Sequence, residues 1–189
     1  MSLNPEWRHR VLSWKDELTR HFYIPLGEIQ WEGFTTKELL TYSEASKGSF
    51  SPMPQGTRWG AKWEYGWFRS TITLPDEAAG KRIVLKVDVG GESAIYVNSV
   101  NAGAKDNEHN EVTLTMNGVP RQQYEILVEA YAGHGPRVAS AGPTPPGRLT
   151  VPEPGPTQAV VGESIYGIWE EEVYQLWLDV QTLFEVREN

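Results

Sequence analysis

The chain has 189 residues, no cysteine and a formal net charge of −8. This length suits a single domain, the lack of cysteine excludes disulfides and thiol chemistry, and the acidic balance without a basic cluster argues against a nucleic-acid partner. No apolar run is long enough to span a membrane and the first residues contain no apolar leader, so we expect a cytoplasmic protein without membrane contact.

Large apolar residues recur at helical spacing near the N-terminal end. They form one stripe along residues 5–22, while charged residues fill the other face. The stripe consists of Trp7, Val11, Trp14 and Leu18. Pro25 and Gly27 predict the end of this helix. Residues 28–60 show no clear period, so we expect this stretch to wrap over the domain with little regular structure.

From residue 65 onward, apolar and polar residues alternate, which is typical of strands. The predicted strands cover residues 65–74, 83–89, 94–98, 112–116 and 124–132. The last of them has few polar positions on either face, so we expect it to lie in the middle of its sheet. Five such segments at about ten-residue spacing predict a mainly β protein, an antiparallel β-sandwich.

Two further segments follow the strands. Residues 133–157 are rich in Gly and Pro, which predicts a semi-rigid connector with room for an edge strand near residues 148–151. Residues 165–187 place apolar side chains at helical spacing, and the acidic residues 170–172 would suit the dipole at the start of a helix. The predicted organisation is an N-terminal helical extension at 1–24, a β-sandwich at 25–157 and a C-terminal helical connector at 158–189.

Eight tryptophans and eight tyrosines are a large number for this length. Such rings fill cores, and their flat faces also suit the C–H groups of sugars, so both interpretations stay open for Trp59, Trp63 and Trp67. Trp67 and Phe68 are neighbours on a predicted strand and point to opposite sides. One of them must lie outside the sandwich core, in contact with solvent, a loop or another domain, and we expect it to be Trp67.

The residues show no complete catalytic or metal-binding set. There is no Gly-x-Ser-x-Gly elbow, no phosphate-binding loop and no HExxH motif among the four histidines. Asp106 and His109 lie three residues apart, but a metal site needs three or four ligands, so we predict no metal site. The carboxylates available for a glycosidase pair are Glu92, Asp106, Glu108, Glu125 and Glu129. Exposed acids are common, so such a pair alone indicates nothing.

A run of motifs between residues 59 and 135 forms a recognisable pattern. It consists of Trp59-Gly60, Trp63, Trp67-Phe68-Arg69, Leu74-Pro75, Ile83-Val84-Leu85-Lys86-Val87, Ile95-Tyr96-Val97-Asn98, Gly103 and Leu127-Val128-Glu129-Ala130-Tyr131. This pattern resembles the galactose-binding-like jelly rolls that are attached to glycosidases. Glu92 and the Gly-to-Asp turn near Asp106 are similar to the N-terminal domain of glycoside hydrolase family 38 α-mannosidases. Asn98-Ser99 stands where many such domains have Asn-Gly, which predicts a less tight turn.

The resemblance implies a jelly-roll sandwich with flanking helices that packs on a catalytic barrel, expected to follow Asn189. The zinc ion, nucleophile and acid/base of the retaining α-mannosidase reaction would belong to that barrel, so this chain is expected to hold no cofactor and to be inactive by itself. The implied function is that of a non-catalytic accessory domain that shapes the rim of the active site or joins subunits in a homo-oligomer. The alternative is a carbohydrate-binding module that recognises mannose-type sugars through exposed aromatic residues.

Eight residues are candidates for contact with a sugar or with the catalytic domain. They are Trp59, Trp63, Trp67, Glu92, Asp106, His109, His134 and Arg137. The last four lie on turns between strands, from which they can reach the mouth of the barrel in a longer enzyme. Ordinary loop polarity is the alternative explanation for these four.

Overall fold

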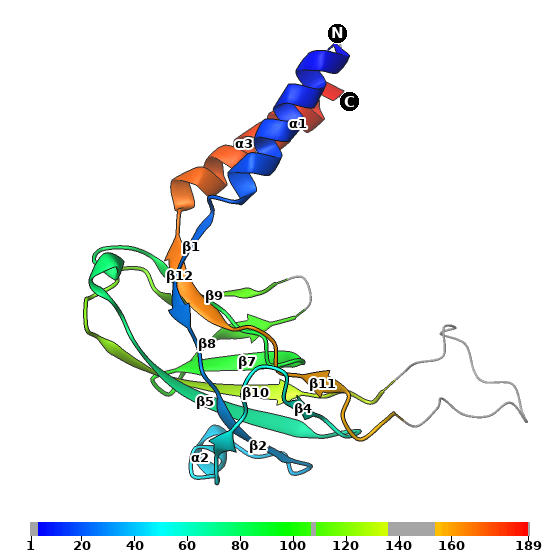
Figure 1. Cartoon of the computed structure of the whole chain (residues 1–189), viewed down its shortest axis with the longest axis vertical. Coiled ribbons are helices and arrows are strands. Elements are labelled where there is room, and N and C mark those ends of the chain that lie inside the picture. The colour runs from blue at the N-terminus through cyan, green and yellow to red at the C-terminus, as the bar shows by residue number, and fades with distance from the viewer. Residues whose placement is uncertain (1–3, 107–108, 136–153, 189) are drawn as a thin grey trace, which may run out of the picture.

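The computed structural model describes residues 4–106, 109–135 and 154–188 as a two-sheet sandwich with a two-helix arm (Figure 1). Its elements, in chain order, are α1 Pro5–Thr19, β1 Tyr23–Glu28, β2 Glu32–Thr36, α2 Tyr42–Ala45, β3 Ser51–Pro52, β4 Arg58–Trp59, β5 Tyr65–Thr73, a 3₁₀ turn at Asp76–Ala78, β6 Ile83–Lys86, β7 Glu92–Val97, β8 Val100–Lys105, β9 Glu111–Thr115, β10 Gln123–Tyr131, β11 Ala159–Val160, β12 Ile165–Trp169 and α3 Glu171–Glu188. Within these described residues, no helix is long and apolar enough to cross a membrane.

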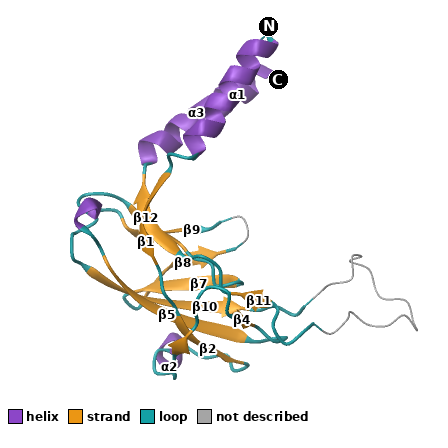
Figure 2. Ribbon diagram, in the orientation of Figure 1, coloured by secondary structure: helices purple, strands orange, loops and turns teal. Residues whose placement is uncertain are grey.

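The strands form two main antiparallel sheets and one small pair (Figure 2). The four-stranded sheet has the order β1-β12-β6-β9, and the six-stranded sheet has the order β3-β2-β5-β10-β7-β8. The short strands β4 and β11 pair with each other. The prediction of a mainly β, jelly-roll sandwich is therefore confirmed. So is the central position of β10, which pairs with β5 on one side and β7 on the other.

The main core lies between the two sheets, and a smaller one lies outside the six-stranded sheet. Phe68 belongs to the main core, whereas its neighbour Trp67 packs with Ala45 and Leu127 on the opposite side. Trp67 thus lies outside the sandwich core, as predicted, against the segment that contains α2. That segment covers Trp67 completely, because both Trp67 and Ala45 are fully buried.

The prediction that residues 28–60 lack regular structure is wrong. β2 lies in the six-stranded sheet beside β5, where Gly33 pairs with Phe68. A Cβ at Gly33 would lie 2.6 Å from the sulfur of Met53 and 2.8 Å from the carbonyl oxygen of Trp67, so only glycine fits this close approach. Because the buried position carries no side chain, the alternation that marks a strand is not visible in the sequence.

The C-terminal helix begins later than its apolar spacing predicts. Residues 165–169 form β12, which pairs with β1 on one side and β6 on the other. Tyr166 and Ile168 point into the main core. A short apolar run suits a buried strand as well as a helix, which explains the error. The sandwich therefore includes β12 and extends past residue 157, and the helical part starts only at Glu171.

The N-terminal helix ends earlier than predicted, at Thr19, because β1 follows at once. Pro25 and Gly27 do not stand after the helix but within β1, where the register with β12 shifts between them. β1 is an edge strand, and prolines within sheets are found on edge strands and at irregularities of this kind. The predicted edge strand near residues 148–151 lies outside the described residues.

Helices α1 and α3 lie side by side and antiparallel, with both chain ends near the tip of the arm (Figure 1). Asn4 caps α1 by accepting a hydrogen bond from the backbone N–H of Trp7 at 2.9 Å. Lys15 of α1 donates to the side-chain oxygen of Gln181 on α3. Arg8 lies over the ring of Phe184 at 5.8 Å.

An aromatic cluster joins the base of the arm to the sandwich. The ring of Phe22, just before β1, lies 5.4 Å from Tyr174 and 5.8 Å from Trp177 on α3, and 6.0 Å from Trp169 at the end of β12. The backbone N–H of Glu170 donates to the carbonyl of Phe22 at 2.8 Å. The paired strands β1 and β12 therefore lead directly into the paired helices.

Candidate functional site

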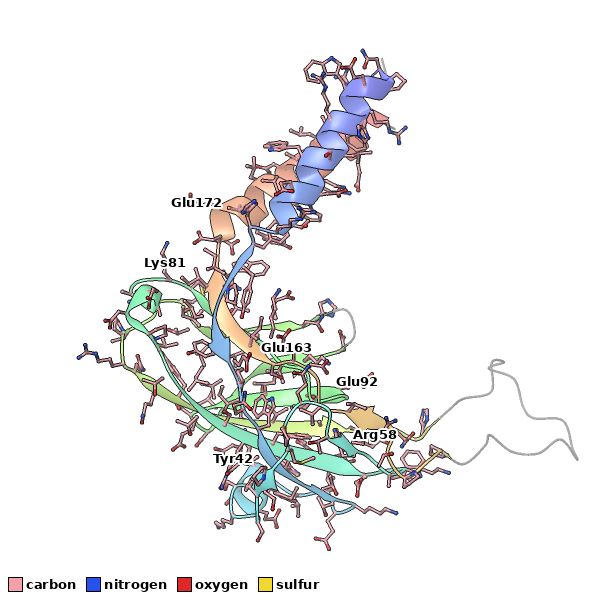
Figure 3. All side chains as sticks on the ribbon, viewed as in Figure 1. Tyr42, Arg58, Lys81, Glu92, Glu163 and Glu172 are labelled. Carbon is pink, nitrogen blue, oxygen red and sulfur yellow. The ribbon has the colours of Figure 1, made fainter. Side chains whose placement is uncertain are left out.

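The outer face of the six-stranded sheet carries a hollow of about 520 Å³, which we call the Tyr131 hollow. It is lined by Tyr65, Glu92, Ser93, Ala94, Ala104, Lys105, Asp106, His109, Glu129 and Tyr131. The sheet register explains why these residues meet. Tyr131 on β10 pairs with Tyr65 on β5 and with Glu92 on β7, so the three side chains form one row across the sheet. Figure 3 labels Glu92 at the start of β7.

Three aromatic rings form one wall of the Tyr131 hollow and its rim. The rings of Tyr65 and Tyr131 lie 5.2 Å apart and are tilted by 34°. Trp63 stacks on Tyr131 at 6.5 Å and meets the ring of His134 edge-on at 5.8 Å. About half of Trp63 remains exposed, at 53%. The wall therefore presents aromatic surface to solvent beside polar groups.

Trp63 has a left-handed backbone, with φ of 62°. Bulky side chains rarely adopt this conformation, which costs about 1–2 kcal/mol. The N–H of Trp63 donates to the carbonyl of Gly133 at 3.0 Å, and Glu64 closes the turn by accepting from the N–H of Ala61 at 2.7 Å. The surrounding turn thus holds a strained, exposed tryptophan at the rim of the hollow.

Glu129 lies in the next row of the sheet, between Trp67 and Ala94. Ala94 in turn pairs with Ala104 on β8, and these two small side chains leave the space beside Glu129 that forms the hollow. Within the part of the chain that the structure describes, the Glu129 carboxylate has no hydrogen-bond or ion-pair partner. Its partial burial raises its pKa above the usual range.

The remaining charged side chains of the hollow are engaged with neighbours. Asp106 accepts a hydrogen bond from the backbone N–H of His109 at 2.7 Å, and its carboxylate lies 3.1 Å from Nδ1 of that histidine. The ammonium of Lys105, which is mostly buried, lies 3.6 Å from Asp88. The hollow therefore presents an acidic character through Glu92 and Glu129.

The donor groups do not fit a catalytic zinc ion. Among the described residues, no three His, Cys, Asp or Glu side chains gather closely enough to hold a metal. Asp106 and His109 supply two ligands at most, whereas zinc needs three protein ligands even in a catalytic site. We therefore derive no chemical step through zinc on these residues.

The structure brings five of the eight predicted contact residues together and places two others, Trp59 and Trp67, elsewhere. Trp63, Glu92, Asp106, His109 and His134 lie in or beside the Tyr131 hollow. Arg137 lies outside the described residues.

The prediction that Trp59 and Trp67 contact a sugar or another domain is wrong, because both rings are buried. Trp59 is 3% exposed, packs against Phe68 and donates its indole N–H to the carbonyl of Val89 at 2.7 Å. Trp67 is fully buried under α2. Neither ring has a face left for a sugar or a neighbouring domain.

Tyr65 and Tyr131 were not predicted from the sequence as site residues, and Glu129 was only one of several available carboxylates. Tyr65 and Tyr131 stand at opposite ends of two long strands in the sequence, and only the register of β5 with β10 makes them neighbours. The alternation of β10 does place Glu129 and Tyr131 on the same face. The shared face of Glu129 and Tyr131 could thus be read from the sequence, but the pairing of β10 with β5 could not.

A second hollow, of about 680 Å³, lies on the same outer face of the six-stranded sheet, next to α2. Arg69 sits at its wall, where it donates two hydrogen bonds to one oxygen of Glu32, at 2.7 and 2.9 Å. The same guanidinium lies 4.3 Å from the centre of the Phe50 ring. Tyr42, which Figure 3 labels, donates from its hydroxyl to Ser99 at 3.0 Å. These polar groups are already paired, which distinguishes this hollow from the first.

The arm carries an exposed apolar face, which we call the open arm face and define by Trp7, Trp14, Leu176 and Leu183. Each of the four stands one residue before a side chain that contacts the other helix. A helix turns 100° per residue, and in an antiparallel pair the preceding residue turns to the same side on both helices. The exposed fractions are 55% and 50% for the tryptophans, and 42% and 70% for the leucines.

The opposite side of the arm is mostly polar. The residues that follow the four contact residues are His9, Asp16 and Glu185, which are exposed, and Leu178, which is half-buried. The helix pair is therefore amphipathic, and its apolar face is not covered by the described part of this chain.

Comparison with known proteins places the sandwich in a family. A family model described as the jelly roll domain of α-mannosidase, Ams1-like, matches residues 25–153, which is more than half of the chain. The chain belongs to this family of α-mannosidase jelly roll domains. The resemblance to an α-mannosidase jelly roll that the sequence motifs predicted is confirmed by this match.

Individual proteins resemble this chain to different extents. Human α-mannosidase 2C1 is 33% identical over 63 residues, which cover 33% of this chain and 6% of that protein. The β-glucuronidase of Faecalibacterium prausnitzii superposes with a TM-score of 0.50 at 14% identity, over 78% of this chain and 32% of that one. A Ruminococcus gnavus β-glucuronidase gives 0.49 at 14% identity, over 78% and 28%. The glucuronidase likeness concerns the fold alone, and the chain spans a minor part of each relative.

Proposed function

We propose that this α-mannosidase jelly roll domain is a non-catalytic accessory domain that packs on the catalytic part of a longer α-mannosidase through its open arm face. The observation that carries the proposal is the row of exposed apolar side chains on the arm, centred on Trp7 and Trp14. Contiguous apolar surface of this kind, bordered by polar residues, is typical of interaction sites.

The family match supports the choice of partner. The domain is named for α-mannosidases, and the match to human α-mannosidase 2C1 covers only 6% of that protein, so most of such an enzyme lies outside this domain. In this proposal the catalytic carboxylates and zinc belong to that other part. The domain would shape the rim of the active site or support contacts between subunits. A cytoplasmic location stays a prediction from the sequence.

The geometry of the arm supports a docking role over a purely local one. The main core of the sandwich is complete without the arm, because it is built from strands and adjoining loop residues alone. The aromatic cluster around Phe22 fixes the base of the arm, whereas the outer halves of α1 and α3 contact only each other (Figure 1). An arm held at its base and apolar on one side suits a partner that covers that side.

The test compares the same substitutions in two settings. Trp7→Gln with Trp14→Gln removes the two largest exposed rings of the open arm face, and His9→Gln on the polar side of α1 is the matched control. In the 189-residue chain, the double substitution is expected to change the free energy of unfolding by no more than about 0.5 kcal/mol, because both rings are half exposed. In the full-length enzyme, it is expected to weaken domain docking by roughly 2 kcal/mol or more.

Differential scanning calorimetry and kcat/KM on an α-mannoside are the measurements. A lower Tm and a lower kcat/KM of the full-length enzyme, with His9→Gln unchanged, would support docking through this face. Equal values for the double variant and the unsubstituted enzyme would overturn it. Loss of the oligomer without any change in the monomer's Tm would also overturn it, because the face would then join copies instead of domains.

A further inference from the structure

The Tyr131 hollow combines open aromatic surface with polar groups that have no partner in the described chain. Beyond the accessory role, and independent of the arm, we infer that this hollow is a binding site for a neutral pyranose sugar. The ring wall of Tyr65 and Tyr131 with Trp63 at its rim would contact the C–H face of the sugar, and the carboxylates of Glu92 and Glu129 would accept hydrogen bonds from its hydroxyls.

The first argument is the state of the polar groups. Among the described residues, the carboxylates of Glu92 and Glu129 have no hydrogen-bond or ion-pair partner, and the hydroxyls of Tyr65 and Tyr131 have none either. Buried polar groups are normally satisfied, and Tyr65, Glu129 and Tyr131 are partly buried, whereas Glu92 is exposed. A sugar offers several hydroxyls within a few ångströms of one another, and these can donate to carboxylates and accept from phenols.

The phenol of Tyr131 is a hydrogen-bond donor at neutral pH. Loss of solvent, with a smaller effect of the neighbouring Tyr65, raises the pKa of the Tyr131 hydroxyl. The rise moves this pKa further from neutral pH, where a phenol is protonated in any case and can donate a hydrogen bond. With carboxylate acceptors on the same wall, the hollow offers both kinds of partner that a hydroxyl requires.

The second argument is the aromatic wall. Ligand sites typically combine apolar and aromatic walls with a few placed polar groups. Trp63 is half exposed, and its backbone conformation is unfavourable for a tryptophan. A residue held in a strained conformation at the edge of a hollow is more typical of a binding site than of a structural turn.

The third argument is charge, which selects the class of ligand. Lys105 is paired with Asp88, and Asp106 is paired with His109, so the unpaired charges are the carboxylates of Glu92 and Glu129. They would repel an acidic sugar such as a glucuronate, because its carboxylate would approach two like charges. A neutral pyranose avoids this repulsion. The carboxylates would also attract a cation, so the test must distinguish a cationic ligand from a neutral sugar.

The experiment titrates the 189-residue chain with methyl α-mannoside, D-glucuronate and N-acetyl-lysine amide, followed by ¹H–¹⁵N NMR shifts and calorimetry. We expect saturable binding of methyl α-mannoside with Kd on the order of 1 mM, no binding of glucuronate and no binding of the lysine analogue. Tyr131→Ala and Glu129→Gln should each weaken binding about tenfold. Glu125→Gln lies on the same strand and face but outside the hollow and should leave Kd unchanged.

Three results would overturn the inference. They are absence of saturable binding of methyl α-mannoside at concentrations well above its expected Kd, an unchanged Kd in Glu129→Gln, and binding of the lysine analogue alone. Glu129→Gln preserves side-chain shape, so it keeps the test decisive even if Tyr131→Ala unfolds. None of these results bears on the arm, because Trp7 and Trp14 are not substituted.

Discussion

At the scale of single residues, the turn at Asn98-Ser99 shows how this sequence departs from a preferred pattern without losing the geometry. Asn98 and Ser99 have φ values of 47° and 69°, which is the two-residue turn that favours Asn-Gly. The turn between β7 and β8 is therefore tight, and the expectation of a looser one is wrong. The side chain of Asn98 accepts a hydrogen bond from the N–H of Glu125 at 2.9 Å, and the hydroxyl of Ser99 accepts one from the hydroxyl of Tyr42. These side-chain hydrogen bonds stabilise a backbone conformation that is unfavourable for serine.

Ser99→Gly should therefore be more stable than Ser99→Ala. Both variants lose the hydrogen bond to Tyr42, but only alanine keeps the side chain that makes a positive φ unfavourable. We expect a difference of about 1 kcal/mol in the free energy of unfolding, measured by urea denaturation. Equal stability of the two variants would show that the turn is not strained.

Glu129→Gln should stabilise the chain at neutral pH. Partial burial raises the pKa of Glu129 in the folded state, so the folded chain binds this proton more tightly than the unfolded chain does. The stabilising contribution of that proton is present at pH values below the pKa of Glu129 in the unfolded chain. It is lost as the pH rises through the higher pKa of Glu129 in the folded chain. Glutamine stays neutral throughout.

Thermal unfolding at several pH values tests this. The Tm of Glu129→Gln should exceed that of the unsubstituted chain at pH 7, and the two should converge as the pH falls below about 4. Glu125→Gln, exposed on the same strand, is the control. A constant Tm difference across the whole pH range would contradict the assignment of the effect to Glu129 ionisation.

At the scale of elements, the strands with clear alternation were predictable and the concealed ones were not. β5, β6 and β9 follow from period-two patterns, and α1 follows from apolar residues three or four positions apart. β2 was not recognised because Gly33 occupies its buried position. β12 was assigned to the following helix because its short apolar run suits a helix as well as a strand. A strand can be recognised from local alternation only when its buried positions carry apolar side chains, and a glycine at such a position conceals it.

The joint between strands and helices is the element on which the arm depends. Phe22→Ala removes the ring that contacts Tyr174 and Trp177 at the base of α3. We expect backbone amides of α1 and α3 to exchange hydrogen at least about tenfold faster, because the helices lose the packing that holds them against the sandwich. Exchange in β5 and β10 should stay the same and serves as the internal control. Unchanged exchange in both helices would contradict a structural role for this cluster.

At the scale of the whole molecule, only part of the membership of the candidate site was predictable, and its assembly was not. Trp63, Glu92 and His109 were identified as candidates from residue type and position, and they do meet at one hollow. Trp59 and Trp67 have the same residue type as Trp63 and yet are buried, because only the packing of the two sheets and α2 decides which ring stays exposed. Composition identifies candidates, and register and burial select among them.

The arm and the Tyr131 hollow give the molecule two separate surfaces of different chemistry. The arm leads out of the four-stranded sheet and is apolar on one side, and the hollow lies on the outer face of the six-stranded sheet and is aromatic and acidic. A domain with this arrangement can be attached to an enzyme through one surface while the other faces a sugar chain.

The docking of the arm is the central claim, and hydrogen exchange tests it most directly. Amide exchange of α1 and α3 is measured in the 189-residue chain and again within the full-length enzyme. The account predicts that both helices gain protection in the full-length enzyme, with the largest gain around Trp7, Trp14 and Leu183. Equal exchange of these segments in both settings would mean that nothing covers the open arm face, and it would contradict the proposed accessory role.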